Sequence, residues 1–198
     1  GTVVLTPGYG GGSSSMADWG QFYASHGFIS MTIGPNNEID DTWEQRAYGL
    51  LDAITTVKEE HWRTTSPVLG LVDTNRFIVS GYSMGGGASQ IALTIEDPAN
   101  SQSIVAAIGL NPFISLYDCD NCPPGSPEGC WCFLPIHMIH DTPTLIIAGE
   151  IEIEEFPAYE GSVGQDIYAY TPETTTKMLY EIESGGHGSA AYLYGDVL

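Results

Sequence analysis

Basic residues are scarce in this sequence. Its 198 residues include 5 Lys and Arg against 25 Asp and Glu, which gives a formal net charge of −20 at pH 7. Such a charge repels phosphates, so nucleic acids and anionic membrane surfaces are poor partners. A net charge of this size is typical of a strongly hydrated protein surface. The alternative is a cation site in the acidic segment 150–155 with Glu160, but no EF-hand spacing is present, so we expect no metal site and no cofactor.

Long hydrophobic runs are also absent. No apolar segment approaches the roughly 18 residues that a membrane-spanning helix requires, so we expect a soluble chain without a membrane span. No charged segment followed by an apolar one marks a signal peptide. The sequence opens directly in the strand-like segment 1–6, so we expect a leader and part of the domain to lie outside it. The length of 198 residues favours a single domain, residues 1–198, which we expect to be a monomer.

Cysteines are few, and all of them lie in one short stretch rich in Pro and Gly. They are Cys119, Cys122, Cys130 and Cys132. The first pair has the spacing of half a zinc site, but the second pair does not match the other half. We therefore favour two local disulfides over a zinc site or free thiols, and with them an oxidising compartment. The pairing stays open, although a bond between Cys130 and Cys132 would close a strained ring.

Six short apolar runs have the composition of buried strands, and helix-forming segments separate them. The expected strands are 2–6, 28–33, 76–80, 104–108, 144–148 and 177–182. Apolar strands that alternate with helices predict a mostly parallel sheet covered by helices on both faces. In such α/β folds the functional residues lie at the carboxyl ends of the strands.

Two of the expected helices have clear boundary signals. The serines of segment 13–15 can cap a helix that ends at His26-Gly27. The segment Asp41-Thr42-Trp43-Glu44 has the form of a capping box and opens a long helix that ends at His61. The apolar residues expected at helical spacing on it are Tyr48, Leu50, Leu51, Ile54 and Val57.

The chain is organised around Gly81-Tyr82-Ser83-Met84-Gly85, between an expected strand and an expected helix. At such a junction this pattern indicates a nucleophile elbow, in which the serine takes a strained, positive φ. The glycines are needed because the strand and helix backbones pass close together. The alternative is an ordinary Gly-rich helix start with Ser83 as its N-cap. The apolar run before the motif and the small residues after it favour the elbow.

The serine needs a base, because its hydroxyl is hardly nucleophilic at its own pKa. Among the five histidines, His187 alone lies in a glycine-flanked loop just after an expected strand. The order nucleophile, acid, histidine is that of α/β-hydrolase active sites, and only His187 lies late enough for it. We therefore predict that His187 is the base.

The acid of such a site should follow the strand 144–148 and accept a hydrogen bond from the histidine Nδ1–H. Spacing alone does not choose among the four glutamates there, which are Glu150, Glu152, Glu154 and Glu155.

Acyl transfer also requires N–H donors that face the developing oxyanion. We expect one from Met84, directly after the nucleophile, and one from Tyr9, in the glycine-rich turn after the first strand.

Several motifs occur in a fixed order over most of the chain outside the cysteine segment. They are Pro7-Gly8-Tyr9, Trp19-Gly20, Ala24-Ser25-His26-Gly27-Phe28, Asp73-Thr74-Asn75-Arg76, Gly81-Tyr82-Ser83-Met84-Gly85-Gly86-Gly87, Pro143-Thr144-Leu145-Ile146 and Gly185-Gly186-His187. As an ordered set they resemble the bacterial cutinase and polyethylene terephthalate (PET) hydrolase family, in the dienelactone-hydrolase-like branch of the α/β-hydrolases. The resemblance implies an α/β-hydrolase fold and a secreted serine esterase that cleaves polyester or acylglycerol bonds.

The resemblance also implies roles for individual residues. The family's acid, an aspartate, falls on Glu152, and its oxyanion donors fall on Tyr9 and Met84. Its aromatic ring-clamping position, a tryptophan after a proline, falls on Phe113. The residue before the nucleophile, often Trp or His in the family, is Tyr82 here.

Three departures from the family pattern bear on the site. Glutamate in place of aspartate at position 152 lengthens the arm by one methylene, so either the loop is reshaped or a neighbour serves instead. Glu154 stands where the family places an apolar substrate contact. The connection within 113–142 is longer than usual and holds the cysteines with Trp131, so we predict a stapled flap over the cleft, with a remote structural loop as the alternative.

The resemblance also implies strands upstream of Gly1 and a helix downstream of His187 that are absent or cut short here. The leading hypothesis is a secreted esterase that acts on polymers such as cutin or PET through an acyl-enzyme. The alternatives are a small-acyl or lipid esterase and a catalytically weak protein that binds a hydrophobic polymer.

Overall fold

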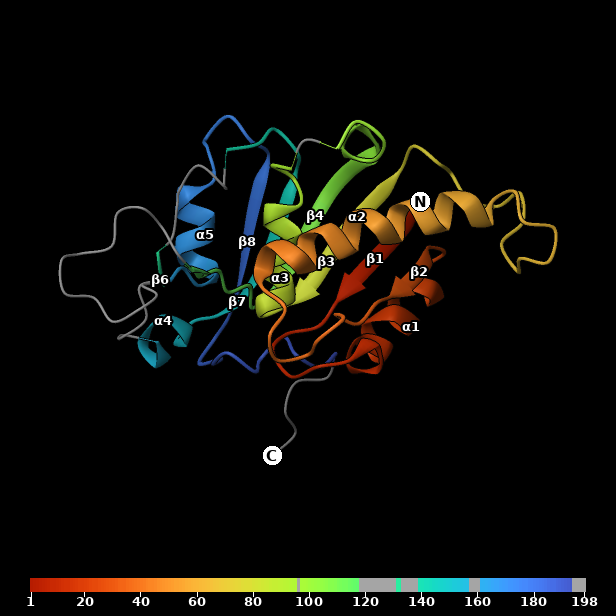
Figure 1. Ribbon diagram of the computed structural model, residues 1–198. Coiled ribbons are helices and arrows are strands. Elements are labelled where there is room, and N and C mark those ends of the chain that lie inside the picture. Colours follow the sequence, from red (N-terminus) through yellow and green to blue (C-terminus); the bar gives the residue numbers. More distant parts are fainter. Residues whose placement is uncertain (96, 118–130, 133–138, 157–160, 194–198) are drawn as a thin grey trace.

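Six parallel strands form one sheet in the computed structural model of the protein (Figure 1). The structure describes residues 1–95, 97–117, 131–132, 139–156 and 161–193. In the order β2-β1-β3-β4-β7-β8 across the sheet, the strands are Ile29–Thr32, Thr2–Thr6, Phe77–Tyr82, Ile104–Leu110, Thr144–Gly149 and Lys177–Ile182. Each lies where the sequence predicted a strand. With helices flanking the sheet, this arrangement confirms the predicted α/β-hydrolase fold class.

Helices enclose a hydrophobic core on each face of the sheet. On one face lie α2 (Trp43–Glu60), α3 (Met84–Ile91) and α5 (Gly164–Tyr170), of which α2 and α3 cross in front of the strands in Figure 1. On the other face, α1 (Ala17–Ser25) and the 3-10 turn η1 (Ser13–Met16) contribute to a second core. Strand β1 is buried along its whole length between the two cores. That position explains the apolar residues Val3, Val4 and Leu5 at its centre.

The capping box of the long helix α2 lies one residue later than predicted: its N-cap is Thr42 and not Asp41. The box forms between Thr42, whose hydroxyl accepts from the Gln45 N–H, and Gln45, whose side chain accepts from the Thr42 N–H. Asp41 instead accepts a hydrogen bond from the Asn36 N–H, so its carboxylate holds the preceding loop. Asp41 with Glu44 and Thr42 with Gln45 both fit the sequence pattern of a capping box. Because the Asp41 carboxylate binds the preceding loop, Thr42 is the N-cap.

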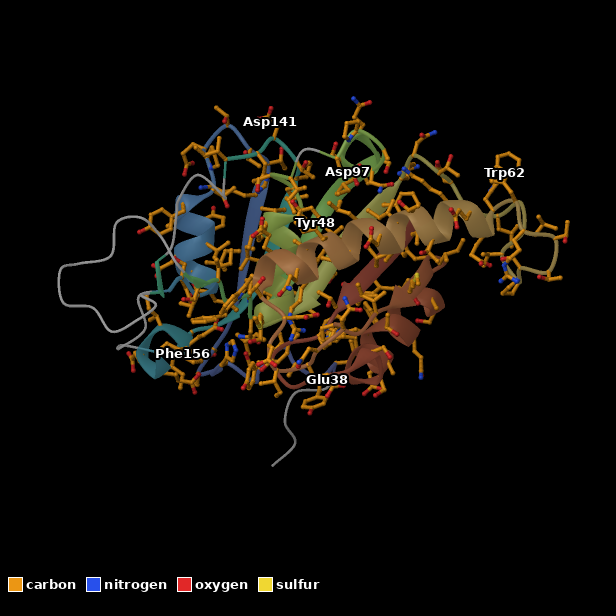
Figure 2. The ribbon with its side chains drawn as sticks, in the orientation of Figure 1. Glu38, Tyr48, Trp62, Asp97, Asp141 and Phe156 are labelled. Atoms are coloured by element: carbon orange, nitrogen blue, oxygen red, sulfur yellow. The ribbon has the colours of Figure 1, made fainter. Side chains whose placement is uncertain are left out.

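The buried face of α2 agrees with the predicted pattern at all but one position. Leu50, Leu51, Ile54 and Val57 are buried as predicted. Tyr48 is 50% exposed, and Figure 2 shows it on the solvent side of the helix. The prediction was wrong there because the buried stripe passes through Ala47, and the next residue of a helix lies about 100° around the axis.

The segment predicted as an insertion, 113–142, includes a two-stranded antiparallel ribbon of β5 (Leu116–Tyr117) and β6 (Trp131–Cys132). Cys119, Cys122 and Cys130 lie outside the described residues, as do the side chains of Trp131 and Cys132. The disulfides and the flap therefore stay predictions. Within the described residues, no helix combines the length and the apolar character needed to cross a membrane.

His140 is a buried histidine in the connection that leads into β7, with a relative exposure of 8%. Burial lowers the pKa of His140 below its ordinary value of 6.5, although the Thr142 backbone and Asp141 act in the opposite direction. Below pH 6.5 the unfolded chain therefore takes up a proton that the folded chain resists. The contribution of this residue to stability is complete above that pH and is lost as the pH falls.

We predict that His140→Gln reduces the acid sensitivity of folding. Between pH 7.0 and 5.5, the free energy of unfolding of the unmodified chain should fall further than that of the variant, by at most about 1.4 kcal/mol per pH unit. Urea unfolding at the two pH values measures this difference. Because both proteins contain the same carboxylates, the comparison removes their contribution to the pH dependence. Equal changes in the two proteins would contradict the lowered pKa of His140.

Candidate active site

The turn between β3 and α3 holds Ser83 in a strained conformation. Its φ is 52° and its ψ is −120°, and its side chain makes no capping hydrogen bond to α3. A Cβ on Gly81 would lie 2.5 Å from the carbonyl carbon of Gly85, and a Cβ on Gly85 would overlap the carbonyl oxygen of Thr6. The close approach of three backbone segments thus excludes side chains at both glycines. The predicted elbow is confirmed, and the alternative of Ser83 as an ordinary N-cap is wrong.

A chain of hydrogen bonds joins the three side chains that the sequence singled out. The Oγ of Ser83 lies 2.7 Å from Nε2 of His187, and Nδ1 of His187 lies 2.5 Å from Oε1 of Glu152. The three residues come from the elbow, the loop after β8 and the first residue of α4 (Glu152–Glu155). In this geometry the imidazole can take a proton from the serine hydroxyl while the carboxylate accepts the Nδ1–H.

Glu152 differs from its acidic neighbours in its burial. Its side chain is fully buried, whereas Glu150, Glu154 and Glu155 are exposed. The extra methylene of glutamate therefore does not prevent the contact with His187, and no neighbour replaces it. Glu154, predicted as a substrate contact, lies on the solvent side of α4.

The acidic segment also holds the backbone of the histidine loop. Oε2 of Glu150 accepts from the Ser184 N–H at 2.8 Å, and Oε2 of Glu155 accepts from the His187 N–H at 2.5 Å. On the other side, the hydroxyl of Tyr82 donates to the His187 carbonyl at 3.0 Å. Tyr82 thus contacts the histidine loop directly.

In the described part of the chain, no group of three or more His, Cys, Asp or Glu side chains is arranged to hold a metal ion.

Asn111, which sequence reasoning missed, anchors the same loop from the end of β4. Its φ is 40°, and its Oδ1 accepts from the Ala190 N–H at 2.6 Å while its Nδ2 donates to the Gly186 carbonyl at 3.3 Å. The one signal in the sequence was its position three residues after the expected strand 104–108, since asparagine tolerates a positive φ.

Two phenylalanines pack beside the catalytic candidates. The ring of Phe156 lies edge-on to the His187 imidazole at 4.9 Å, and it also packs against Phe113 at 5.3 Å. The carbonyl of Phe113 accepts from the indole N–H of Trp43 at 2.6 Å, which fixes its backbone. Figure 2 shows Phe156 beside α4. Sequence reasoning named Phe113 but missed Phe156, whose only signal was its place at the end of the acidic segment.

The turn after β1 lies directly against the nucleophile. A Cβ on Gly8 would come within 2.9 Å of the Cβ of Ser83, so the backbone that leads into Tyr9 passes next to the serine. Met84, the first residue of α3, follows the serine directly in the chain. The two residues predicted to supply oxyanion donors thus flank Ser83, and the side chain of Tyr9 is 66% exposed.

Comparison with known proteins identifies the family. A family model described as "PETase: PET hydrolase-like" matches residues 1–119. The chain belongs to this PET hydrolase-like family. It is 30% identical over 189 residues to bis(hydroxyethyl) terephthalate hydrolase of Streptomyces coelicolor, a match that covers 96% of this chain and 51% of that protein. It is 28% identical over 187 residues to cutinase est1 of Thermobifida alba, covering 94% of this chain and 53% of the cutinase.

The similarity is higher over a shorter stretch. Cutinase 2 of Thermobifida cellulosilytica is 34% identical over 113 residues, which cover 57% of this chain and 40% of that cutinase. The chain spans about half the length of the first two relatives. These matches confirm the predicted resemblance to the ester hydrolases of the cutinase and PET hydrolase family.

The elbow yields a prediction for stability. Gly85→Ala should destabilise the fold by about 2 kcal/mol or more, because its methyl group would meet the Thr6 and Pro7 carbonyls. Gly49→Ala, within α2, is the matched control. Its Cβ would make an ordinary 3.5 Å contact with Ile33, so the helix should gain about 0.5–1 kcal/mol. Thermal unfolding of both variants measures this contrast, and similar stabilities would contradict the close approach.

Proposed function

We propose that the protein hydrolyses carboxylic esters through an acyl-enzyme. The observation that carries the proposal is the hydrogen-bond chain from Ser83 through His187 to Glu152. In the first step Ser83 Oγ attacks the ester carbonyl carbon while His187 Nε2 takes its proton. The protonated imidazole then gives that proton to the departing alkoxide. In the second step His187 activates a water molecule that cleaves the acyl-serine ester and restores the hydroxyl.

The buried carboxylate of Glu152 has two tasks in this scheme. It holds the imidazole in the tautomer with hydrogen on Nδ1, so that Nε2 is free to accept the proton. It also stabilises the positive charge that forms on His187 in both steps. The proposal further assigns the N–H groups of Tyr9 and Met84 to the oxyanion, because their backbones flank Ser83 and backbone donors in place need no reorganisation.

Polyesters such as cutin or PET are the proposed substrate class. Support comes from apolar and aromatic side chains at the site, since Phe113 and Phe156 pack beside His187 and Tyr9 is largely exposed. Tyr9 and Tyr192 also line one hollow of about 150 Å³ next to the elbow. Such rings can contact the aromatic or alkyl units of a polymer. The two relatives named cutinase support this class and, with it, secretion into the medium.

A small soluble ester is the second candidate. The relative from Streptomyces coelicolor is named for bis(hydroxyethyl) terephthalate, a low-molecular-weight diester, and it aligns with 96% of this chain. The two candidates share the same mechanism and differ only in the length of substrate that the aromatic side chains contact.

The first test compares the unmodified chain with Ser83→Ala. The unmodified protein should release terephthalate from a PET film and hydrolyse bis(hydroxyethyl) terephthalate, whereas Ser83→Ala should lose at least about 10³-fold in turnover on both. Product release is followed by liquid chromatography. Turnover retained by Ser83→Ala would refute the mechanism, and turnover on the soluble diester alone would favour the second candidate.

The acid is tested by exchanging glutamates one at a time. Glu152→Gln should lower kcat by about 10²- to 10⁴-fold, because the amide cannot stabilise the imidazolium. Glu154→Gln, on the exposed side of α4, is the matched control and should keep kcat within about twofold. The reverse pattern in a p-nitrophenyl ester assay would move the assignment to Glu154.

Phe156 is predicted to act in substrate binding. Phe156→Ala removes the ring that packs on Phe113 and His187. We expect it to raise KM for bis(hydroxyethyl) terephthalate about 3- to 30-fold, in keeping with the loss of one aromatic contact, and to change KM for p-nitrophenyl acetate much less. Equal changes for both substrates would instead indicate that Phe156 only positions His187.

A further inference from the structure

Arg46 is a buried cation with an unusual set of partners. It lies in the first turn of α2, and its relative exposure is 2%. Its guanidinium donates to the carbonyls of Pro7, Gly8, Glu38 and Asp41 at 3.3, 3.5, 2.9 and 3.3 Å. None of the ion pairs among the described residues involves it. Burial lowers the pKa of Arg46 while Asp41 and Glu38 raise it, and a guanidinium in a protein stays protonated.

Two of these carbonyls belong to the turn that runs beside the nucleophile. The Gly8 carbonyl and the Tyr9 N–H are the two ends of one peptide unit, and in a trans peptide they point in opposite directions. A guanidinium that holds the carbonyl in the interior therefore turns the Tyr9 N–H away from the interior. The backbone at Gly8 lies against Ser83, where a Cβ would come within 2.9 Å of the serine Cβ.

The same guanidinium also fixes the far side of the turn. The Glu38 carbonyl accepts both from Arg46 and from the Gly10 N–H, the latter at 2.9 Å, and the Gly8 carbonyl also accepts from the Gly11 N–H at 3.2 Å. Figure 2 shows Glu38 at the edge of the molecule where these loops gather. Arg46 thus contacts the carbonyl acceptors of both of these backbone hydrogen bonds.

From these contacts we infer that Arg46 is a positioning residue for the oxyanion hole, acting through the Gly8–Tyr9 peptide. Its fork of donors sets the direction of the Tyr9 N–H before substrate arrives. Its charge also polarises that peptide, because a hydrogen bond to a carbonyl strengthens the amide as a donor. This inference rests on the proposed esterase function and extends it to a residue that does not touch the substrate.

The test separates this role from a contribution to stability alone. Arg46→Met keeps the apolar stem but removes the donors. Asn100→Ala is the matched control, because Asn100 is a buried residue that donates to Leu51 and Thr55 in a later part of α2. Each variant is assayed for kcat and KM on p-nitrophenyl butyrate, for the Ki of phenylboronic acid and for the melting temperature. Phenylboronic acid forms a tetrahedral adduct on the serine, so its affinity reports on the oxyanion hole.

We expect Arg46→Met to lower kcat about 10- to 100-fold, to weaken phenylboronic acid by a similar factor and to leave KM within about threefold. Asn100→Ala should lower the melting temperature but keep kcat and Ki within about twofold. Arg46→Lys, which keeps the charge with fewer donors, should fall between Arg46→Met and the unmodified protein, and it carries the test if Arg46→Met does not fold.

Unchanged kcat and Ki in a folded Arg46 variant would overturn the inference. It would also be overturned if Asn100→Ala, at the same melting temperature as Arg46→Met, lost as much kcat and phenylboronic acid affinity. Either result leaves the proposed function intact. The proposed function fails separately, if Ser83→Ala retains ester turnover.

Discussion

The close approach of three backbone segments at the carboxyl end of the central strands is the constraint on which the site depends. The end of β1, the end of β3 and the start of α3 meet where a side chain on Gly81 or Gly85 would collide with a carbonyl group. Ser83 takes its positive φ at this junction. The same junction places the turn after β1 against Ser83, so one packing contact sets the position of the serine relative to the backbone that leads into Tyr9.

Three of the many acidic side chains in this chain bind the histidine loop. In a protein of net charge −20, a fully buried carboxylate is costly unless it is hydrogen-bonded, and Oε1 of Glu152 meets that requirement through Nδ1 of His187. Glu150 and Glu155 accept backbone N–H groups of the same loop. The acidic segment is thus an anchor for the imidazole. Asn111 and Tyr82 complete that anchor from two other strands.

Features that depend on local sequence pattern were predicted correctly from the sequence. Residues whose position depends on contacts with distant parts of the chain were not. Apolar runs located all six strands of the main sheet, and glycine spacing located the elbow, because both follow from short-range sterics. The choice of Glu152 among its neighbours needed the family resemblance, since only burial distinguishes them. Phe156 and Arg46 gave no usable signal. Their positions next to the site arise from packing against segments far away in the chain, which no local pattern encodes.

We propose that Ser83 is a nucleophile activated by His187. Peptide mapping by mass spectrometry, after treatment with a fluorophosphonate, tests it most directly. We expect one adduct per chain, on Ser83, formed at least about 10²-fold more slowly in His187→Ala. Labelling spread over other residues, or labelling of Ser83 at an unchanged rate without His187, would contradict it.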